Sequence, residues 1–546
     1  MVAGSWLPRI GRDVRAVRAL SDGAREATEG ARAAVVGLGA LGAEGPEIGD
    51  SLFQRGKVRF EPLSRALPHF RQASVLIGAA SRSVNRAPQP SIEYLRDILS
   101  TAGDDITEAQ RAADTGALLL DLLPDLFGKG GRRSYLLAFQ SLGESRGTGG
   151  VINFYGVLET SRGRVRLTEI APTPRLPDWN GGIIGSPVRG PQWLKESYGP
   201  QKALQQWQQT NLTPNFPVAA NILLKVYEEF TGERLDGVVA MDPITLEFLM
   251  PAVDPVVAFD THVTSRNVAH LLLRDSYLRF DSDEQNRFLI EVVDGFWAAI
   301  SAGKADARRL AEGVAQATSS QHFKVYMRDA ELQEKLARLG ADGFFDTKAS
   351  NVQLVYHQNY GRNKVDYYLH RKVSTEIRLG VDGAAQVTTK IKLRNRAPAQ
   401  LGGAPTVLLG DPAIEGIKAG MNQMLLSVLV PKGVQDARLH ERSESSVVPF
   451  SFDDSGFPVF WDVVKMPPGS SKTIRLEYRI PEALDEGERF ELLVFPQTLV
   501  HPEQYDITIR PPEGKRLWAE GADSPEEVIS LTGALSRPLQ LAVWVN

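Results

Sequence analysis

The sequence predicts a multidomain α+β protein with an N-terminal long-helix bundle, a central α/β sheet domain and a C-terminal β-sandwich region. Apolar residues recur at alternating spacings of four and three over residues 1–130, which is typical of long packed helices. Short apolar runs mix with helical patterns over residues 131–345, and apolar and polar residues alternate strictly in much of 350–546. The 546 residues are enough for three to four domains of roughly 150 residues each.

Composition narrows the class of protein. Hydrophobic residues make up 42% and charged residues 23%, so a disordered or collagen-like chain is excluded. The net charge of −4 argues against a nucleic-acid partner, because proteins that bind nucleic acids are usually basic. The lack of cysteine excludes disulfides, thiolate zinc sites and cysteine nucleophiles. No apolar run reaches the roughly 18 residues that a membrane-spanning helix needs.

The first zone, residues 1–130, is predicted to form three or four long helices packed as a hairpin or bundle. Breaks at Gly42–Pro46 and Ala87–Pro90 separate them. One heptad-like stripe packs equally well inside one chain or between chains, so both a plain helical domain and an arm for self-association or protein partners remain open. This stripe consists of Ile10, Val14, Val17, Ala24, Ala31, Val35 and Leu38, with Ser21 and Thr28 in the same seam.

The second zone, residues 131–345, is predicted to be an α/β domain. Pro217 stands just inside one helix and Gly232 ends it, while Asp242 caps a second helix that has Pro243 at its first position. This mixture of helices with short apolar strands favours a layered α/β arrangement. Strands are expected at 134–140, 151–159, 164–170 and 238–241, and further helices near 265–275, 283–300 and 304–318.

The third zone, residues 350–546, is predicted to be all β. Apolar and polar residues alternate over 365–379, Asp382-Gly383 turns the chain, and the alternation returns over 387–393 and again over 474–480. Proline and glycine clusters separate the strands at intervals typical of a sandwich. The pattern therefore predicts one or two immunoglobulin-like sandwiches.

Several chemical motifs are weak or incomplete. The eight histidines are scattered and form no metal-ligand pair such as HExxH. The glycines of 128–131 precede a strand and lack the Lys-Ser/Thr of a phosphate loop, so we interpret them as a linker. Residues 143–147 match the pattern G-x-S-x-G, but a second strand follows where a nucleophile elbow needs a helix. A serine hydrolase is therefore not expected.

The loop after the first strand of the second zone is the most unusual local feature. Five glycines lie between Gly143 and Gly156, and Glu144 and Arg146 lie among them. Glycine lets a backbone approach a ligand, and the planar arginine fork suits phosphate. The alternative interpretation is a tight connection between strands with a salt-bridged arginine.

Further charged residues follow in two later segments. Arg175 and Asp178 come just after a strand, and Arg274, Arg279, Asp283 and Arg287 lie on a predicted helical stretch. These groups could be ordinary surface ion pairs, with Asp283 and Arg287 at i,i+4. They could also converge on a pyrophosphate and its Mg²⁺.

Four segments resemble blocks of the bacterial DUF4012 family, in the same order along residues 120–400. They read LLAFQSLGESRGTGGVINFYGVLETSRGRV, TEIAPTPRLPDW, NFPVAANILLKVYEEFTGERLDGVVAMDP and YHQNYGRNKVDYYLHRKV. The family has no assigned activity. Its members look like surface-exposed proteins behind one N-terminal membrane helix, so the resemblance implies an extracytoplasmic, cell-surface protein that is membrane-anchored at full length.

A more distant resemblance is to the LytR-CpsA-Psr phosphotransferases, which move a glycan from a polyprenyl-pyrophosphate lipid onto the cell wall with Mg²⁺. This resemblance implies catalytic roles for Arg146, Asp283 and Arg287, with Asp283 or Glu144 at the Mg²⁺. It implies ligand-binding roles for Glu144, Arg175, Asp178, Arg274 and Arg279. The sequence departs from that family after Arg146, where Gly-Thr-Gly-Gly replaces Ser-Asp and removes the metal-binding aspartate.

Two hypotheses of function follow. In the first, the α/β domain binds a lipid-pyrophosphate-linked or cell-wall glycan in envelope or exopolysaccharide assembly, and an active version would be a glycopolymer phosphotransferase. In the second, the chain is a non-catalytic structural or adhesion protein of a cell-surface assembly. Arg146, Arg175 and Arg287 discriminate between them, because the first hypothesis needs these arginines in one pocket beside an apolar tunnel.

Overall fold

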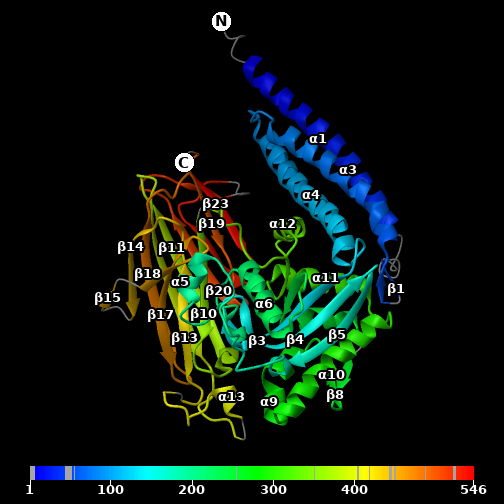
Figure 1. Ribbon diagram of the computed structural model, residues 1–546. Helices are drawn as coiled ribbons and strands as arrows, with labels where there is room; N and C mark the ends of the chain where they lie inside the picture. The colour runs from blue at the N-terminus through cyan, green and yellow to red at the C-terminus, as the bar shows by residue number, and fades with distance from the viewer. Residues whose placement is uncertain are drawn as a thin grey trace. The chain divides into compact units, whose positions relative to one another are not determined.

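The computed structural model describes residues 7–42, 52–54, 56–253, 255–349, 351–402, 405–416, 418–441, 445–447, 450–485, 487–519 and 524–546. The chain divides into two compact units (Figure 1). The N-terminal unit comprises Met1–Arg133, Glu159–Arg166 and Ile300–Arg308, and the C-terminal unit comprises Ser134–Leu158, Leu167–Ala299 and Arg309–Asn546. None of the helices within the described ranges combines the length and apolar character needed to cross a membrane.

Three long helices build the N-terminal unit, which confirms the predicted helical region. They are α1 (Leu7–Ala40), α3 (Phe60–Asn85) and α4 (Glu93–Leu126), and α3 packs against both of the others. Two short strands, β1 (Phe53–Gln54) and β2 (Lys57–Val58), pair with each other. The core shared by the helices consists of Ala33, Ala73, Ile77, Ala80, Val84, Ile106 and Ala113.

The contact between α1 and α3 does not use the predicted apolar stripe of α1, all of whose positions are exposed. It uses small residues spaced seven apart on another face, because a residue without a large side chain lets the two backbones approach closely. A Cβ atom on each of three glycines would lie within 2.8 Å of a side-chain carbon of α3. The pairs are Gly23 with Val84, Gly30 with Ile77, and Gly37 with Phe70.

The α/β part of the C-terminal unit is built on one sheet, in which strands expected at 134–140, 151–159, 164–170 and 238–241 are all present. Its seven strands are, in order, β1, β2, β5 (Arg164–Pro172), β4 (Gly149–Ser161), β3 (Arg133–Arg146), β6 (Gly237–Met241) and β9 (Phe323–Met327), with β2 and β5 paired at Lys57 and Arg164. β3 and β6 are parallel, whereas β9 is antiparallel to β6.

Two helices of this part carry the predicted terminal signals, with Gly232 at the end of the first and Asp242 at the start of the second. Asn215 caps α6 (Phe216–Thr231), which ends at Gly232 in a left-handed conformation with φ of 71°. Asp242 caps α7 (Pro243–Leu249) by accepting from two backbone N–H groups. The other helical segments are η1 (Thr173–Arg175), α5 (Gln192–Tyr198), η2 (Trp207–Gln209), η3 (Met250–Ala252), α8 (Val268–His270), the π-turn η4 (Leu271–Asp275), α9 (Ser276–Arg279), α10 (Ser282–Ser301), α11 (Ala307–Ser319) and α12 (Ala330–Arg338). A small separate sheet holds β7 (Val256–Ala258) and β8 (Thr261–Val263).

The remaining part of the C-terminal unit contains two seven-stranded sheets, which confirms a strand-rich C-terminal region (Figure 1). The first is ordered β16 (Phe450–Asp454), β17 (Phe457–Met466), β13 (Asn422–Leu429), β10 (Val352–Asn359), β19 (Arg489–Val494), β23 (Leu539–Val545) and β21 (Leu517–Ala519). The second is ordered β15 (Ser445–Val447), β14 (Gln435–Glu441), β18 (Ser471–Ile480), β12 (Ala385–Asn395), β11 (Leu369–Leu379), β20 (Glu503–Arg510) and β22 (Ile529–Leu535). A short helix, α13 (Thr406–Leu409), lies between β12 and β13 in the sequence. Side chains of both sheets form one apolar core, so this part is a sandwich.

One predicted strand begins later than expected. The alternation over 365–379 predicts a single strand, but residues 365–368 form a 3₁₀ turn, η5, and β11 begins at Leu369. Asn363 accepts from the backbone N–H of Val365 and holds this turn, while Asp366 is 4% exposed and hydrogen-bonded to other buried polar groups. Local side-chain bonds of this kind compete with a strand ladder.

Candidate functional site

The loop that the sequence singled out is a tight connection of two residues, Gly147 and Thr148, between β3 and β4. A Cβ at Gly147 would overlap the carbonyl oxygen of Leu212, and one at Gly150 would overlap that of Ser141. These glycines therefore make room for neighbouring backbone of the same chain. A strand follows the connection, so Ser145 does not stand at a nucleophile elbow.

Arg146 is buried where this connection meets the sandwich. Its Nε donates to the carbonyl oxygen of Gln208 at 3.2 Å, and its Nη1 donates to those of Ser145 at 2.9 Å and Asn359 at 3.3 Å. The Oε1 atom of Glu144 lies 3.6 Å from Nη2. Burial lowers the pKa of Arg146, and the charge of Glu144 opposes this shift. Arginine remains charged in such surroundings, so the guanidinium is a buried cation held by protein carbonyls and one acid.

Asp366 is the buried acid nearest to this arginine in the hydrogen-bond network. It accepts from the backbone N–H of Ser145 at 2.9 Å, from Asn359 Nδ2 at 3.1 Å and from Asn422 Nδ2 at 2.7 Å. Burial raises the pKa of Asp366, and the hydrogen bond from Ser145 opposes that rise. Asp366 thus ties the end of β3 to the sandwich.

Gln497 completes the attachment from the segment after β19. Its Nε2 donates to the carbonyl oxygens of Arg146 at 3.0 Å and His357 at 2.7 Å. Its Oε1 accepts from the His357 N–H and from Arg371 Nη1, both at 3.0 Å. Every hydrogen-bonding group of this amide is therefore used. We call the side chains of Glu144, Arg146, Asn359, Asp366 and Gln497 the junction network.

A second ion pair lies behind the junction network inside the sandwich. Arg371 donates from Nε to Glu503 and from Nη2 to the carbonyl oxygen of Val355 at 2.8 Å. Burial holds the pKa of His357 well below its usual range, and the neighbouring charge of Arg371 adds to the effect. Both effects favour the neutral imidazole, whose Nδ1 lies 3.1 Å from Arg371 Nη1.

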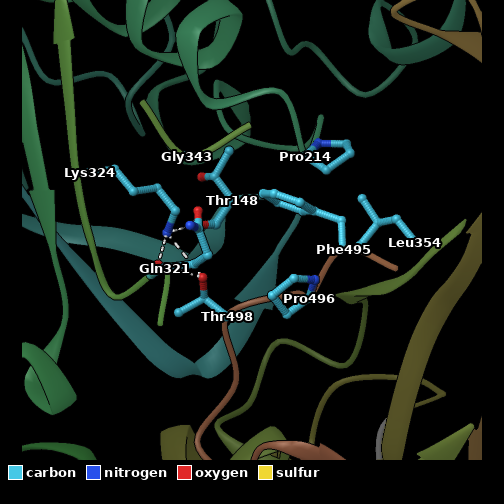
Figure 2. A pocket seen from close by; sticks show the side chains of 10 residues that line it. Thr148, Pro214, Gln321, Lys324, Gly343, Leu354, Phe495, Pro496 and Thr498 are labelled. Atoms are coloured by element: carbon cyan, nitrogen blue, oxygen red, sulfur yellow. Dashed lines mark hydrogen bonds between the residues drawn. The ribbon is translucent and has the colours of Figure 1, made fainter. Parts of the chain in front are cut away.

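A small cavity lies beside the β3–β4 connection (Figure 2). The Nζ atom of Lys324 points toward one side of it and donates to the carbonyl oxygens of Thr148 at 3.1 Å and Gln321, and to Thr498 Oγ1 at 3.0 Å. Burial lowers the pKa of Lys324 to about 8. The space available to water centres is ≈ 10 Å³, which is room for about one water molecule. A pyrophosphate or a lipid chain does not fit this space.

A further buried acid, Asp454, joins the sandwich to the α/β part through Tyr198 and Thr213. Asp454 of β16 accepts from Tyr198 OH of α5 at 2.7 Å and from Thr213 Oγ1 at 2.9 Å. Tyr198 OH also lies 2.9 Å from Tyr356 OH of β10. Burial raises the pKa of Asp454 to about 6, and the hydrogen bond from Tyr198 opposes the rise.

The structure brings only two of the predicted site residues into contact, Glu144 and Arg146. Arg175 lies on η1 and Asp178 on the turn after it, and both are exposed. Asp178 adopts a positive φ of 49°, which places it in a turn conformation. Neither residue takes part in the junction network.

The predicted arginines of the helical stretch are also separate from Arg146. Arg274 pairs with Asp275 at 2.7 Å and donates from Nε to Tyr368 OH at 3.1 Å. Arg279 is exposed at the end of α9. Asp283 and Arg287 are exposed on α10, and the Arg287 guanidinium lies 5.8 Å from the centre of the Phe259 ring.

The two alternative acids expected at Mg²⁺, Asp283 and Glu144, lie on different elements. Asp283 is on α10 and Glu144 is on β3, where Glu144 faces Arg146 and Lys364. Among the residues that the structure describes, no three histidine, aspartate or glutamate side chains are grouped so as to hold a metal ion.

Sequence reasoning missed most of the junction network, although one signal was available. All eight residues of β10 are buried, yet Gln353, His357, Gln358 and Asn359 among them are polar. Buried polar groups need partners, so a polar cluster in an otherwise apolar strand indicates a buried network. Lys324, the second residue of the short, otherwise apolar strand β9, gives the same signal.

Residues 130–277 match the model of a protein family described as "Protein of unknown function (DUF4012)". This match supports the resemblance noted in the sequence and covers part of the chain. The chain matches no curated protein at a significant level.

Solved structures give only weak likenesses. A candidate nutrient binding protein from Legionella pneumophila is 9% identical, with 36% of this chain and 70% of that chain covered and a TM-score of 0.22. An M1 zinc metallopeptidase from Deinococcus radiodurans is 12% identical, with 32% and 42% covered and a TM-score of 0.18. An aminopeptidase N family protein from Idiomarina loihiensis is 11% identical, with 32% and 29% covered and a TM-score of 0.17. Scores this low support no argument about function.

Proposed function

We propose that this chain is a non-catalytic structural protein of a bacterial cell-surface assembly, in which the α/β part is a scaffold fastened to the sandwich. The single observation behind this proposal is that Arg146 is buried and bonded to other parts of the same chain. Its guanidinium is buried among carbonyl oxygens of Gln208, Ser145 and Asn359 and beside Glu144. A group held in this way joins two parts of a fold and has no free face for a phosphate.

The positions of the other candidates support the same proposal. Arg175 and Arg287 are exposed on separate elements, and Arg287 packs against a phenylalanine ring. The cavity beside the junction network holds about one water molecule. A transferase acting on a lipid-linked pyrophosphate needs several cations around one open site and a long apolar channel.

We also propose the finer relationships that the resemblance implies. The α/β part would be a LytR-CpsA-Psr-like domain that has lost its catalysis, and the sandwich would be immunoglobulin-like. The parallel pair of β3 and β6 and the two sheets with a shared core are compatible with these assignments. An extracytoplasmic, membrane-anchored location is proposed from the DUF4012 resemblance alone.

The test is binding of geranylgeranyl pyrophosphate, as a lipid-pyrophosphate probe in mild detergent, by isothermal titration calorimetry with and without Mg²⁺. We expect no saturable binding and no release of phosphate. Arg287→Ala is the informative variant, because its side chain is exposed and its removal should leave the fold intact. Saturable binding that Arg287→Ala weakens would contradict the scaffold proposal and support a lipid-linked glycan ligand.

A second candidate function, glycan binding without transfer, is favoured by one surface feature. Phe450 and Trp461 face each other across β16 and β17, with ring centres 5.2 Å apart and planes at 27°, and Phe450 is 71% exposed. Exposed aromatic faces suit the apolar face of a pyranose ring. Cellohexaose binding that Phe450→Ala removes would support this candidate, with Tyr94→Ala, which alters a 72% exposed ring on α4, as the matched control. No binding by the wild-type chain would contradict it.

A further inference from the structure

One face of α1 carries an apolar stripe that none of the described residues of the N-terminal unit covers. Its larger members are exposed: Ile10 by 51%, Val14 by 61%, Val17 by 49%, Val35 by 65% and Leu38 by 44%. The smaller members between them, Ser21, Ala24, Thr28 and Ala31, are exposed as well. Contiguous apolar surface of this kind on a helix marks an interaction site.

The stripe is separate from the face of α1 that packs within the chain. That second face consists of Ala16, Gly23, Gly30 and Gly37, which are buried against α3. Both faces have a period of seven residues. α1 is therefore built to pack on two sides, and one of the two partners is supplied by α3.

The spacing of the stripe specifies the shape of the missing partner. Positions 14, 21, 28 and 35 are a positions of a heptad, and positions 10, 17, 24, 31 and 38 are d positions. An unbroken heptad of this length is about 42 Å long at 1.5 Å per residue. It fits another long helix. The β-branched Val14, Thr28 and Val35 at a match one half of the pattern for a two-stranded coiled coil, and Leu38 is the one leucine at d.

The charged residues that flank the stripe indicate that its partner is α1 of a second copy, packed in parallel. Arg18, Arg25 and Arg32 are exposed e positions on one edge of the stripe. In an antiparallel pair the e positions of both copies face each other, so arginines would oppose arginines. In a parallel pair each e position faces a g position of the other copy.

The g positions on the opposite edge suit the parallel arrangement. They are Asp13, Leu20, Ala27 and Ala34. Arg18 would face the partner's Asp13, an opposite charge whose carboxylate also accepts from Ser91 of its own chain. Arg25 and Arg32 would lay their stems beside the partner's Leu20 and Ala27, of which Ala27 also packs partly on the helical core of its own chain. No like charges meet in this register.

We propose that α1 dimerises in parallel and in register with α1 of a second copy, through the stripe from Ile10 to Leu38. This inference deepens the assembly role proposed above and rests on it for its biological meaning. The contact itself is a property of the helix and is tested without reference to any ligand.

The first experiment is sedimentation equilibrium on the full chain. We expect concentration-dependent dimerisation, which Val35→Glu weakens at least tenfold because it places two charges in the dimer core. Val36→Glu is the matched control, since Val36 is 53% exposed but lies off the stripe. Circular dichroism checks that both variants keep their helices. A wild-type chain that stays monomeric at 100 μM, or equal effects of the two variants, would overturn the proposal.

The second experiment uses the lack of native cysteine, so that each introduced thiol is unique. In a parallel, in-register pair Ala24→Cys is a d position opposite itself and should form a disulfide-linked dimer under mild oxidation. Glu29→Cys lies at a b position, away from the axis, and should not. Crosslinking of Ala24→Cys with Thr28→Cys, but not with itself, would indicate an antiparallel pair and overturn the parallel register.

Two outcomes separate this inference from the proposed function. If the chain is monomeric and does not bind geranylgeranyl pyrophosphate, the dimer inference is overturned and the scaffold proposal stands. If the chain dimerises through α1 and binds geranylgeranyl pyrophosphate, the α1 contact is confirmed and the scaffold proposal is contradicted. Binding of the stripe to anionic phosphatidylglycerol vesicles by a chain that does not dimerise would overturn the inference in favour of a membrane surface.

Discussion

At the residue scale, buried acids and bases in the C-terminal unit join segments that lie far apart in the sequence. Arg146, Asp366 and Asp454 each have partners in both the α/β part and the sandwich. Replacing one member of such a set leaves another buried polar group without its partner, which costs more than the bond itself contributes. These residues therefore govern stability.

Asp454 makes the stability of the chain depend on pH. Burial raises its folded-state pKa to about 6, from an unfolded value of 3.8. The folded state therefore binds the carboxyl proton of Asp454 more tightly than the unfolded state does. The resulting contribution to the free energy of unfolding is fully present below pH 3.8 and is lost as the pH rises through about 6. We expect the stability difference between wild type and Asp454→Asn to fall by on the order of 3 kcal/mol over that window.

Urea unfolding followed by tryptophan fluorescence at several pH values measures this difference. Asp453→Asn is the control for a change of surface charge, because Asp453 is the exposed neighbour on the same strand. A difference between wild type and Asp454→Asn that stays constant from pH 4 to 6.5 would show that the buried carboxyl does not titrate in this range.

At the element scale, the helix caps and strand alternation were predictable, whereas the packing face of α1 was not. Local rules determine where Asp242 begins a helix and where Gly232 ends one. The face that meets α3 was hidden because its residues are glycines, which carry no hydrophobic signal. The visible apolar stripe is not the face that meets α3, and the sequence left open whether the stripe packs within the chain or between chains.

The glycines of α1 should respond to substitution according to what lies opposite each one. A Cβ at Gly30 would lie 2.5 Å from Ile77 Cγ1, so Gly30→Ala should lower the unfolding free energy by about 1–3 kcal/mol through overpacking. Gly11 has nothing within 4 Å, so Gly11→Ala should raise it by about 0.5–1 kcal/mol through helix propensity. Thermal unfolding at 222 nm compares the two, and stabilisation by both would mean that α1 and α3 do not approach as closely as described.

At the scale of the whole molecule, the candidate site could not be predicted because its parts meet only in the folded chain. Asp366 accepts from Ser145 across 221 residues of sequence, and Gln497 donates to Arg146 across 351. Single-sequence patterns report on neighbours a few residues apart, so they located Arg146 and Glu144 and missed Asn359, Asp366 and Gln497. The glycines beside it suggested a ligand, whereas the space they leave is filled by the loop at Leu212.

These long-range bonds should make the α/β sheet and the sandwich open together. In hydrogen exchange at increasing denaturant, the amides of β3 and β10 should share one opening free energy in the wild type, because Gln497 bonds to both Arg146 and His357. Gln497→Ala leaves buried carbonyls unpaired and should separate the two values by about 1–3 kcal/mol. The control is Gln504→Ala, which removes an exposed amide on β20, a few residues after Gln497 in the sequence. This variant should leave the two opening free energies equal. Separate openings already in the wild type would mean that the junction network positions the two parts without coupling their stability.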